Sequence, residues 1–270
     1  MNDNPTAARD GAPPVKVSRQ QAVGIIELAR PAKFNCLSSA VYAAIEAAID
    51  AFEKPGSGVR AVLVRAQGKN FCTGADLDEV LPLRDDPSGL RRFIGRGHRV
   101  LKRLEACELP VVAACQGLSL AGGCELMLAC DVVFAARDAR FGDQHAQYGL
   151  LPGWGASQRL PRLIGLRRSL DLFFTARWID SETALQWGLV NYIEAPQQLH
   201  QAAFDYCHAL ASRSRTGLAT MKRLARQGLE GPLQTGLQME EADTSIGLLD
   251  PDVTEGLDAF RHRRAPRFAP

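Results

Sequence analysis

The chain has 270 residues, 46% hydrophobic and 23% charged, enough to bury a sizeable core as one large domain or one domain with an appendage. The formal net charge is only +2, so no overall field favours nucleic acid or a membrane surface. Seven cysteines, an odd number with no CxxC pair, lie mostly in hydrophobic runs. They predict reduced, packed thiols in the cytoplasm rather than a disulfide framework or a metal site.

Residues 1–14 are polar and rich in Pro, Gly and Ala, and they predict a disordered N-terminal tail rather than a signal peptide. After this tail, short hydrophobic or β-branched runs bounded by Gly, Pro or polar residues predict strands. These strands are expected at 15–18, 23–28, 59–66, 110–116 and 131–136.

Helices are predicted between the strands, at 38–52 and 90–104, because hydrophobic residues recur there at spacings of three and four. Ser38 or Ser39 is the expected N-cap of the first helix. Alternating strands and helices favour an α/β core with partly parallel sheets, at 15–195.

The second half of the chain is predicted to be almost entirely helical, with one short strand at 189–193. Its helices are expected at 159–175, 181–187, 196–212, 218–229, 236–248 and 253–262. From this pattern we expect residues 196–270 to form a helical region that either caps the core or makes a contact between subunits.

The most hydrophobic stretch, 111–136, is long enough to suggest a transmembrane helix, but it contains Gln116, Glu125 and Asp131. Each acidic residue near the centre of a bilayer costs about 2.5–3.5 kcal/mol. A buried strand–helix–strand unit in a folded core is therefore the better interpretation.

Two glycine-rich segments, 71–77 and 116–126, each link a hydrophobic strand to a helix. Such turns present unpaired backbone N–H groups, and glycine lets a ligand approach them closely. Two N–H groups converging on one oxygen would form an oxyanion hole, worth about 2.7–4 kcal/mol per donor. The alternative is that the glycines only serve tight turns and close packing.

Glu125 is a carboxylate in a hydrophobic run, three residues after Gly122. Burial of a carboxylate raises its pKa towards the range useful for acid–base catalysis. The alternative role is helix capping, but a capping box needs Ser or Thr where this chain has Gly122.

Several segments resemble the enoyl-CoA hydratase/isomerase (crotonase) family, over nearly the whole chain from Val15. The matching segments are RPAKFNCLS (30–38), FCTGAD (71–76), AGGCELMLACD (121–131), FG (141–142), 149–153, QRLPR (158–162) and GLV (188–190). The resemblance implies a spiral of ββα units with two sheets, followed by a C-terminal helical trimerisation region. It also implies homotrimers, commonly paired as hexamers, and an acyl-CoA thioester substrate.

The resemblance also implies roles for individual residues. The N–H groups of Ala75 and Gly122 would form the oxyanion hole, and Glu125 would be a catalytic acid or base. Arg30 and Lys33 resemble residues that bind coenzyme A. Phe260 and Arg263 resemble residues that complete the coenzyme A site of a neighbouring subunit. No cofactor or metal is implied, because coenzyme A is part of the substrate.

Two positions depart from the family pattern. His145 occupies the place of a second catalytic glutamate, where imidazole could exchange a proton or merely line the pocket beside Asp143. A third alternative is that Asp143 itself is the working acid. Trp154 follows Gly153 in the substrate pocket, where a small residue is usual. Its indole either reshapes the acyl site or serves ordinary loop packing.

The sequence therefore predicts an enoyl-CoA hydratase that acts through a thioester enolate stabilised by an oxyanion hole. The alternatives are an enoyl-CoA isomerase, an acyl-CoA decarboxylase, or a catalytically weak protein that binds CoA thioesters. A fourth, nucleic-acid binding through the basic residues 261–267, is disfavoured because few aromatic residues accompany them.

Overall fold

In the computed structural model, which describes residues 13–268, the larger sheet has six strands in the order β1-β2-β3-β4-β6-β9. β1 pairs antiparallel with β2, and all other neighbours are parallel. The prediction of an α/β core with partly parallel sheets is confirmed. The strands are β1 (Val15–Gln20), β2 (Val23–Leu28), β3 (Ala61–Ala66), β4 (Val111–Cys115), β6 (Val132–Ala136) and β9 (Tyr192–Glu194).

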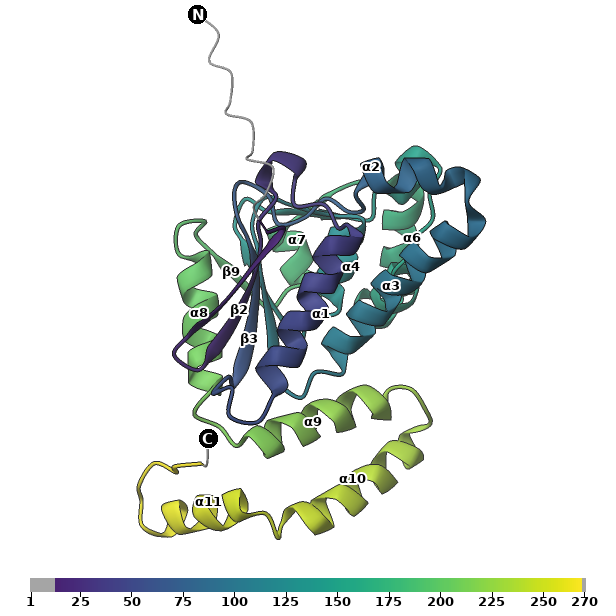
Figure 1. Cartoon of the computed structure of the whole chain (residues 1–270). Helices are drawn as coiled ribbons and strands as arrows, with labels where there is room; N and C mark the ends of the chain where they lie inside the picture. The colour runs from purple at the N-terminus through teal and green to yellow at the C-terminus, as the bar shows by residue number, and fades with distance from the viewer. Residues whose placement is uncertain (1–12, 269–270) are drawn as a thin grey trace, which may run out of the picture.

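Helices cover both faces of this sheet. α8 (Leu199–Leu210) packs on β3, β4 and β6, whereas α1 (Ser39–Glu53) packs on β1 and β2 from the other side, with α3 (Pro87–Glu105) against it (Figure 1). Parallel strands covered on both faces are expected to be hydrophobic throughout, and all five residues of β4 are buried.

The helix α1 follows directly from its sequence. Ser38 is its N-cap, and the Ser38 hydroxyl accepts a hydrogen bond from the N–H of Val41 at 3.3 Å. The residues that predicted the buried face, Val41, Ile45, Ile49 and Phe52, are all buried.

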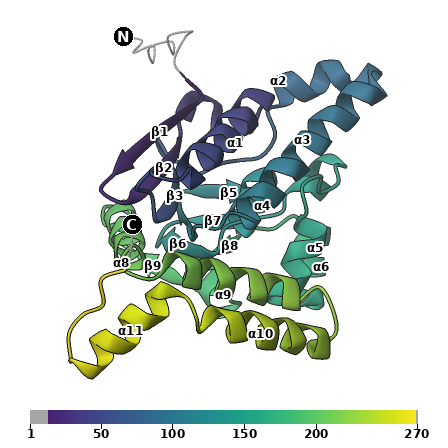
Figure 2. The ribbon, with the colours of Figure 1, turned by 60° about the horizontal axis from the view of Figure 1, so that its bottom comes forward.

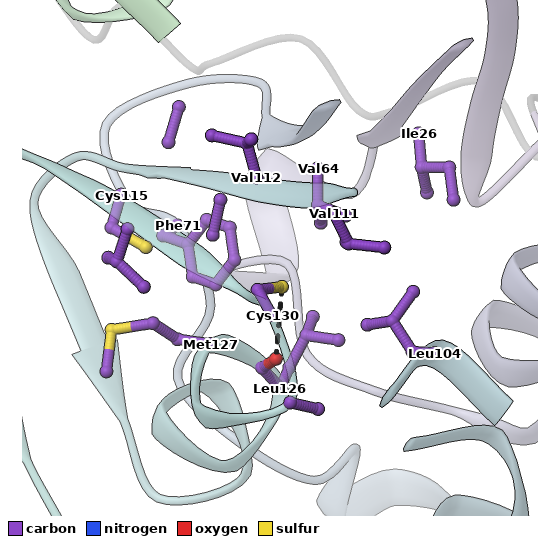
Figure 3. Packing of buried hydrophobic residues seen from close by; sticks show 14 of the residues in the cluster. Ile26, Val64, Phe71, Leu104, Val111, Val112, Cys115, Leu126, Met127 and Cys130 are labelled. Atoms are coloured by element: carbon purple, nitrogen blue, oxygen red, sulfur yellow. Dashed lines mark hydrogen bonds between the residues drawn. The ribbon is translucent and has the colours of Figure 1, made fainter. Parts of the chain in front are cut away.

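The core brings hydrophobic side chains from the strands together with those of α4 (Gly122–Leu128) (Figure 3). The Sγ of Cys130 lies 3.5 Å from the carbonyl oxygen of Leu126 there. All seven cysteines are buried and unpaired, which confirms the prediction of packed thiols.

A second sheet has three short strands, β5 (Leu118–Leu120), β7 (Arg140–Gly142) and β8 (Ile179–Asp180). None was predicted, and the segment 116–126, interpreted as a turn, contains β5. Strands of two or three residues are too short to show a periodic pattern. The existence of two sheets agrees with the family resemblance, and β5 leads directly into the turn before α4.

Two predicted elements were wrong in detail. The single helix at 159–175 is two helices, α5 (Ala156–Ile164) and α6 (Leu166–Thr175), because Gly165 has φ +85° and ends the first. The strand predicted at 189–193 lies later, at β9, after α7 (Ser181–Gln186) and the positive-φ turn at Gly188.

The C-terminal helices form an arm, α9 (Arg215–Gly228), α10 (Leu233–Gly247) and α11 (Pro251–Arg261), alongside the core (Figures 1 and 2). α9 and α10 pack against each other but bury no residue, and α11 buries only Ala259. A trimer contact through this arm stays a prediction. Exposed hydrophobic residues of the arm are Met221, Leu229, Leu233, Leu237, Ile246, Leu248, Leu249, Leu257 and Phe260.

The remaining elements are the short helix α2 (Leu77–Val80) and 3₁₀ helices at Pro31–Lys33, Leu81–Asp85 and His145–Tyr148. Within 13–268, no helix is both long and apolar enough to cross a bilayer. Most of the predicted tail 1–14 lies outside the described residues, but the carbonyl oxygen of Pro14 accepts a hydrogen bond from the N–H of Ala29 at 2.9 Å.

Candidate active site

A cavity of about 420 Å³ lies between the two glycine-rich segments, α3 and the loop before α5. Six residues predicted from the sequence line it together: Ala75, Gly122, Glu125, His145, Gly153 and Trp154. A second, larger groove of about 1050 Å³ runs along the arginine-rich side of α3, but none of these six residues lines it. We therefore take the smaller cavity as the candidate active site.

One wall of this cavity is made of backbone, and we call Ala75 and Gly122 the amide wall. Each follows a residue with positive φ, Gly74 at +115° and Ala121 at +47°. Among residues 13–268, neither the N–H of Ala75 nor that of Gly122 has a hydrogen-bond acceptor. A positive φ is unusual for alanine, so the strain at Ala121 is consistent with a functional turn.

Glycine is required at this wall because the two turns touch. A Cβ on Gly122 would lie 2.5 Å from Cζ3 of Trp154 and 3.2 Å from the Cα of Gly74. A Cβ on Gly74 would lie 3.3 Å from the backbone nitrogen of Gly122. The close-packing explanation is therefore confirmed, whereas the oxyanion hole stays a prediction. The same packing brings the two N–H groups, which have no acceptor among residues 13–268, into one cavity.

Glu125 extends from the first turn of α4 and is fully buried, although it lines the cavity. Its Oε1 accepts hydrogen bonds from the N–H groups of Trp154 at 2.7 Å and Ala156 at 2.9 Å. Its Oε2 has no partner among the described residues. Burial raises the pKa of Glu125, the two N–H donors and His145 lower it, and the net shift is upward.

Glu125 does not cap its own helix. The N–H of Ala121, which a capping box would use, donates to the carbonyl oxygen of Gly142 instead. The carboxylate binds the first N–H of α5, from Ala156, so it connects two helices. One oxygen is fixed by this connection and the other remains free.

His145 lies at the start of a 3₁₀ helix, where its Nδ1 is 2.9 Å from Oδ1 of Asp143. This is ion-pair distance, but the two atoms are not aligned as a hydrogen bond. Burial lowers the pKa of His145, whereas the pairing with Asp143 and the charge of Glu125 raise it, and the net shift is upward. The second nitrogen, Nε2, has no described partner.

Trp154 both packs against its neighbours and lines the cavity. Loop packing and an effect on the shape of the pocket are therefore compatible. Its indole lies edge-to-face against Tyr42 and Phe93, with ring centroids 5.2 and 5.6 Å apart. A Cβ on Gly97 would lie 2.2 Å from its Nε1. The glycines at 97 and 122 thus leave the space that the indole fills.

None of the predicted coenzyme A residues lines the cavity. Arg30 pairs with Asp76 at 2.7 Å and Lys33 with Asp78 at 2.6 Å, both next to the turn that carries Ala75. Phe260 and Arg263 are exposed at the end of the arm.

Further residues line the cavity that the sequence did not identify as site residues, among them Phe93, Tyr148, Leu151 and Trp178. Tyr148 and Leu151 are largely exposed at its edge. Nothing in their spacing distinguishes them from loop or packing residues.

Comparison with known proteins gives one consistent result. The family model described as enoyl-CoA hydratase/isomerase matches residues 18–270. A short-chain-enoyl-CoA hydratase of Clostridium acetobutylicum is 30% identical over 93% of this chain and 95% of its own. A mitochondrial methylglutaconyl-CoA hydratase of Mus musculus is 34% identical over 87% of this chain and 75% of its own. The crystal structure of an enoyl-CoA hydratase from Bacillus anthracis has a TM-score of 0.90 at 32% identity, covering 94% of this chain and 98% of its own.

Proposed function

The chain belongs to the enoyl-CoA hydratase/isomerase family, and from this premise we propose that it hydrates the α,β double bond of an enoyl-CoA thioester. The relatives named as hydratases support this reaction. The observation that carries the proposal is that two free N–H groups, of Ala75 and Gly122, share one cavity with Glu125 and His145.

In the proposed reaction, the amide wall binds the thioester oxygen. When a nucleophile adds to Cβ, the electrons of the double bond move towards the carbonyl and the oxygen becomes negative. The N–H groups of Ala75 and Gly122 then stabilise the enolate without moving, because the fold already holds them in place. Fixed donors of this kind lower the barrier by about 2.7–4 kcal/mol each.

Glu125 and His145 form the second wall of the cavity, which we call the acid–base wall. We assign Glu125 as the base, which takes a proton from water as the water oxygen bonds to Cβ. His145, as imidazolium, gives its Nε2 proton to Cα of the enolate. One water is thereby added across the double bond, and exchange with solvent resets both groups. The upward pKa shift of His145 favours its protonated form near neutral pH.

The acyl group occupies the hydrophobic part of the cavity in this proposal. Leu77, Ile94 and Leu120 line it with Trp154, and among residues 13–268 no Lys or Arg does. A carboxylate on the acyl tail would therefore find no cation there except the imidazolium of His145, which already pairs with Asp143. With about 420 Å³ available, the cavity fits an uncharged acyl group of modest size.

Coenzyme A binding and assembly extend the proposal beyond the cavity. Arg30 and Lys33, beside the turn of Ala75, are proposed to contact the coenzyme A phosphates. Phe260 and Arg263 are proposed to reach the site of a neighbouring subunit in a trimer or hexamer. The exposed hydrophobic residues of the arm support such a contact. The reaction needs no further cofactor, and the seven unpaired thiols support a reducing, cytoplasmic location.

Isomerisation is the second candidate, favoured by one observation. A hydratase of this family pairs two carboxylates around the water, and this chain has an imidazole, His145, at the second position. Moving a double bond requires only that one group carry a proton between two carbons, which Glu125 alone could do.

An acyl-CoA panel analysed by mass spectrometry tests these alternatives directly. Hydration adds the mass of one water, decarboxylation removes carbon dioxide, and isomerisation leaves the mass unchanged but shifts the chromatographic peak. We expect water addition to an uncharged enoyl-CoA, with a rate that Glu125→Gln lowers by about 10³-fold. Tight binding of the thioesters with no turnover would instead indicate a CoA-thioester-binding protein.

A further inference from the structure

Arg159, on α5, holds three acceptors at once. Its Nη1 donates to the carbonyl oxygen of Trp154 at 2.6 Å, and its Nε and Nη2 donate to the two oxygens of Glu105 at 2.6 Å each. Gly155 makes this possible, because a Cβ there would lie 2.0 Å from Nη1. The planar guanidinium alone offers donors in this fixed arrangement, so lysine could not reproduce it.

The carbonyl group that Arg159 binds, that of Trp154, belongs to the loop that positions Glu125. Trp154 donates its N–H to Oε1 of Glu125 and accepts Arg159 at its carbonyl. Ala156, two residues later, supplies the second N–H to the same oxygen. Arg159 therefore fixes the loop from one side while Glu125 is bound from the other.

Glu105, the partner of Arg159, also connects to the C-terminal arm. Nη1 of Arg226, on α9, lies 3.3 Å from Oε1 of Glu105, and its Nη2 lies 2.7 Å from Oδ1 of Asp131. Lys222, one turn earlier, binds Oδ2 of Asp131 at 2.6 Å. α9 buries no residue of its own, and these ion pairs are among the polar contacts that attach it to the core.

The same contacts reach Glu125 by a second route. Asp131 follows α4, the helix that carries Glu125, and Nη2 of Arg226 also lies 3.5 Å from the carbonyl oxygen of Ala129 at the end of that helix. The arm thus contacts both the end of α4 and, through Glu105 and Arg159, the loop that holds the carboxylate.

We propose that Arg159 is a positioning residue that couples the placement of the C-terminal arm to the orientation of Glu125, through Glu105 and Arg226. The expected effect on kcat rests on the proposed function, whereas the structural link between the arm and the loop that binds Glu125 does not. If the arm moves away from the core, the loop that binds Glu125 loses its support, and the catalytic rate falls.

The first test replaces Arg159 by lysine, with Arg162→Lys as the matched control on the same helix. Arg162 is exposed and, within the described part of the chain, bonds only Gln158, one turn back on its own helix. We expect Arg159→Lys to lower kcat by about tenfold or more with little change in KM, since a small misplacement of a catalytic group is costly. The limb of the pH–rate profile governed by Glu125 should move to higher pH, because loosened N–H donors no longer lower its pKa.

The second test measures the coupling. Arg226→Ala should also lower kcat. In the double variant Arg159→Lys/Arg226→Ala, the fold-decrease in kcat should be smaller than the product of the two single fold-decreases. Arg223→Ala is the control on the same helix, because the partners of Arg223 among residues 13–268 lie within the arm: Asp243 at 2.6 Å and Gln227 at 3.4 Å. Losses that multiply would overturn the coupling, as would an unchanged kcat and pH limb in Arg159→Lys.

Hydrogen exchange provides a readout that needs no turnover. The amides of Trp154 and Ala156 should exchange faster in Arg159→Lys and in Arg226→Ala than in the wild type, and at wild-type rates in Arg162→Lys and Arg223→Ala. Faster exchange with no hydration of any acyl-CoA would support the coupling while refuting the proposed function. Unchanged exchange in Arg226→Ala would refute the coupling, whatever the activity.

Discussion

The amide wall of the cavity, at Ala75 and Gly122, offers two N–H groups that have no acceptor in the part of the chain that the structure describes. The acid–base wall instead offers the side chains of Glu125 and His145. The first depends on turn geometry and glycine, and almost any side chain at position 75 would preserve its N–H. The second depends entirely on which side chains are present. In the proposed mechanism, the amide wall sets the class of chemistry, and the acid–base wall sets the particular reaction.

The two walls also differ in what destabilises them and in what compensates for it. The amide wall carries unusual backbone angles at Gly74 and Ala121, held by packing between the two turns. The acid–base wall carries buried charge, which Asp143 and the N–H groups of Trp154 and Ala156 stabilise. Substitutions in each wall should therefore fail in recognisably different ways.

Glu125→Gln is expected to have the largest effect and tests the acid–base wall alone. The glutamine carbonyl oxygen can still accept the N–H groups of Trp154 and Ala156, so the fold should survive. Without a titrating group, kcat should fall by about 10³-fold. Steady-state hydration and thermal unfolding check this together, and a loss below tenfold with an unchanged Tm would remove Glu125 from the chemistry.

Gly122→Ala is expected to rank second and tests the amide wall. The added methyl would lie 2.5 Å from the indole of Trp154, so the turn must shift and misdirect its N–H. The loss of one well-placed donor should lower kcat by about 10²-fold. Gly95→Ala is the matched control, since a Cβ there meets nothing within 4 Å. Equal activity in the two variants would show that the amide pair is not an oxyanion hole.

Trp154→Leu is expected to change the preference for acyl chain length more than the maximal rate. Leucine leaves free the space between Gly97 and Gly122 that the indole fills. We expect the ratio of kcat/KM for a longer to a shorter enoyl-CoA to rise by about tenfold, the usual scale for one methylene in a hydrophobic pocket. Competition assays with paired chain lengths measure this ratio, and no change would make Trp154 a packing residue only.

Asp143→Asn is expected to have the smallest effect at the pH optimum and sharpens the role of His145. Asp143 raises the pKa of His145. Because the proposed reaction needs the protonated imidazole, we expect the alkaline limb of kcat to lie at the raised pKa. Removing the charge should move this limb to lower pH. In His145→Ala the limb should disappear. A limb unmoved in Asp143→Asn would indicate that another group supplies the proton.

Six of the predicted site residues line one cavity, and their catalytic roles stay predictions. The segments that carry Ala75, Gly122 and Glu125 could be recognised because their signals are local. A glycine-rich turn before a helix and a carboxylate in a hydrophobic run can each be recognised within about ten residues, and the family resemblance placed them together. The long strands and α1 were predicted for the same reason, because the hydrophobic pattern of each lies within one short stretch of sequence.

Features that join distant parts of the chain could not be predicted in this way. The contacts of Glu125 with Trp154 and of Arg159 with Glu105 span 29 and 54 residues, and no spacing rule indicates them. The space for the indole depends on Gly97, in the middle of α3, which the sequence shows only as a glycine in a helix. The strands of the second sheet were missed because they are too short to carry a pattern.

Isotope-edited infrared spectroscopy of a bound, unreactive acyl-CoA tests the central claim most directly. With ¹³C at the thioester carbonyl of a saturated acyl-CoA, the C=O stretch should fall on binding, because the N–H groups of Ala75 and Gly122 polarise the bond. The fall should shrink in Gly122→Ala and persist in Gly95→Ala. A carbonyl frequency in the wild-type complex equal to that of the free thioester in water would contradict the account.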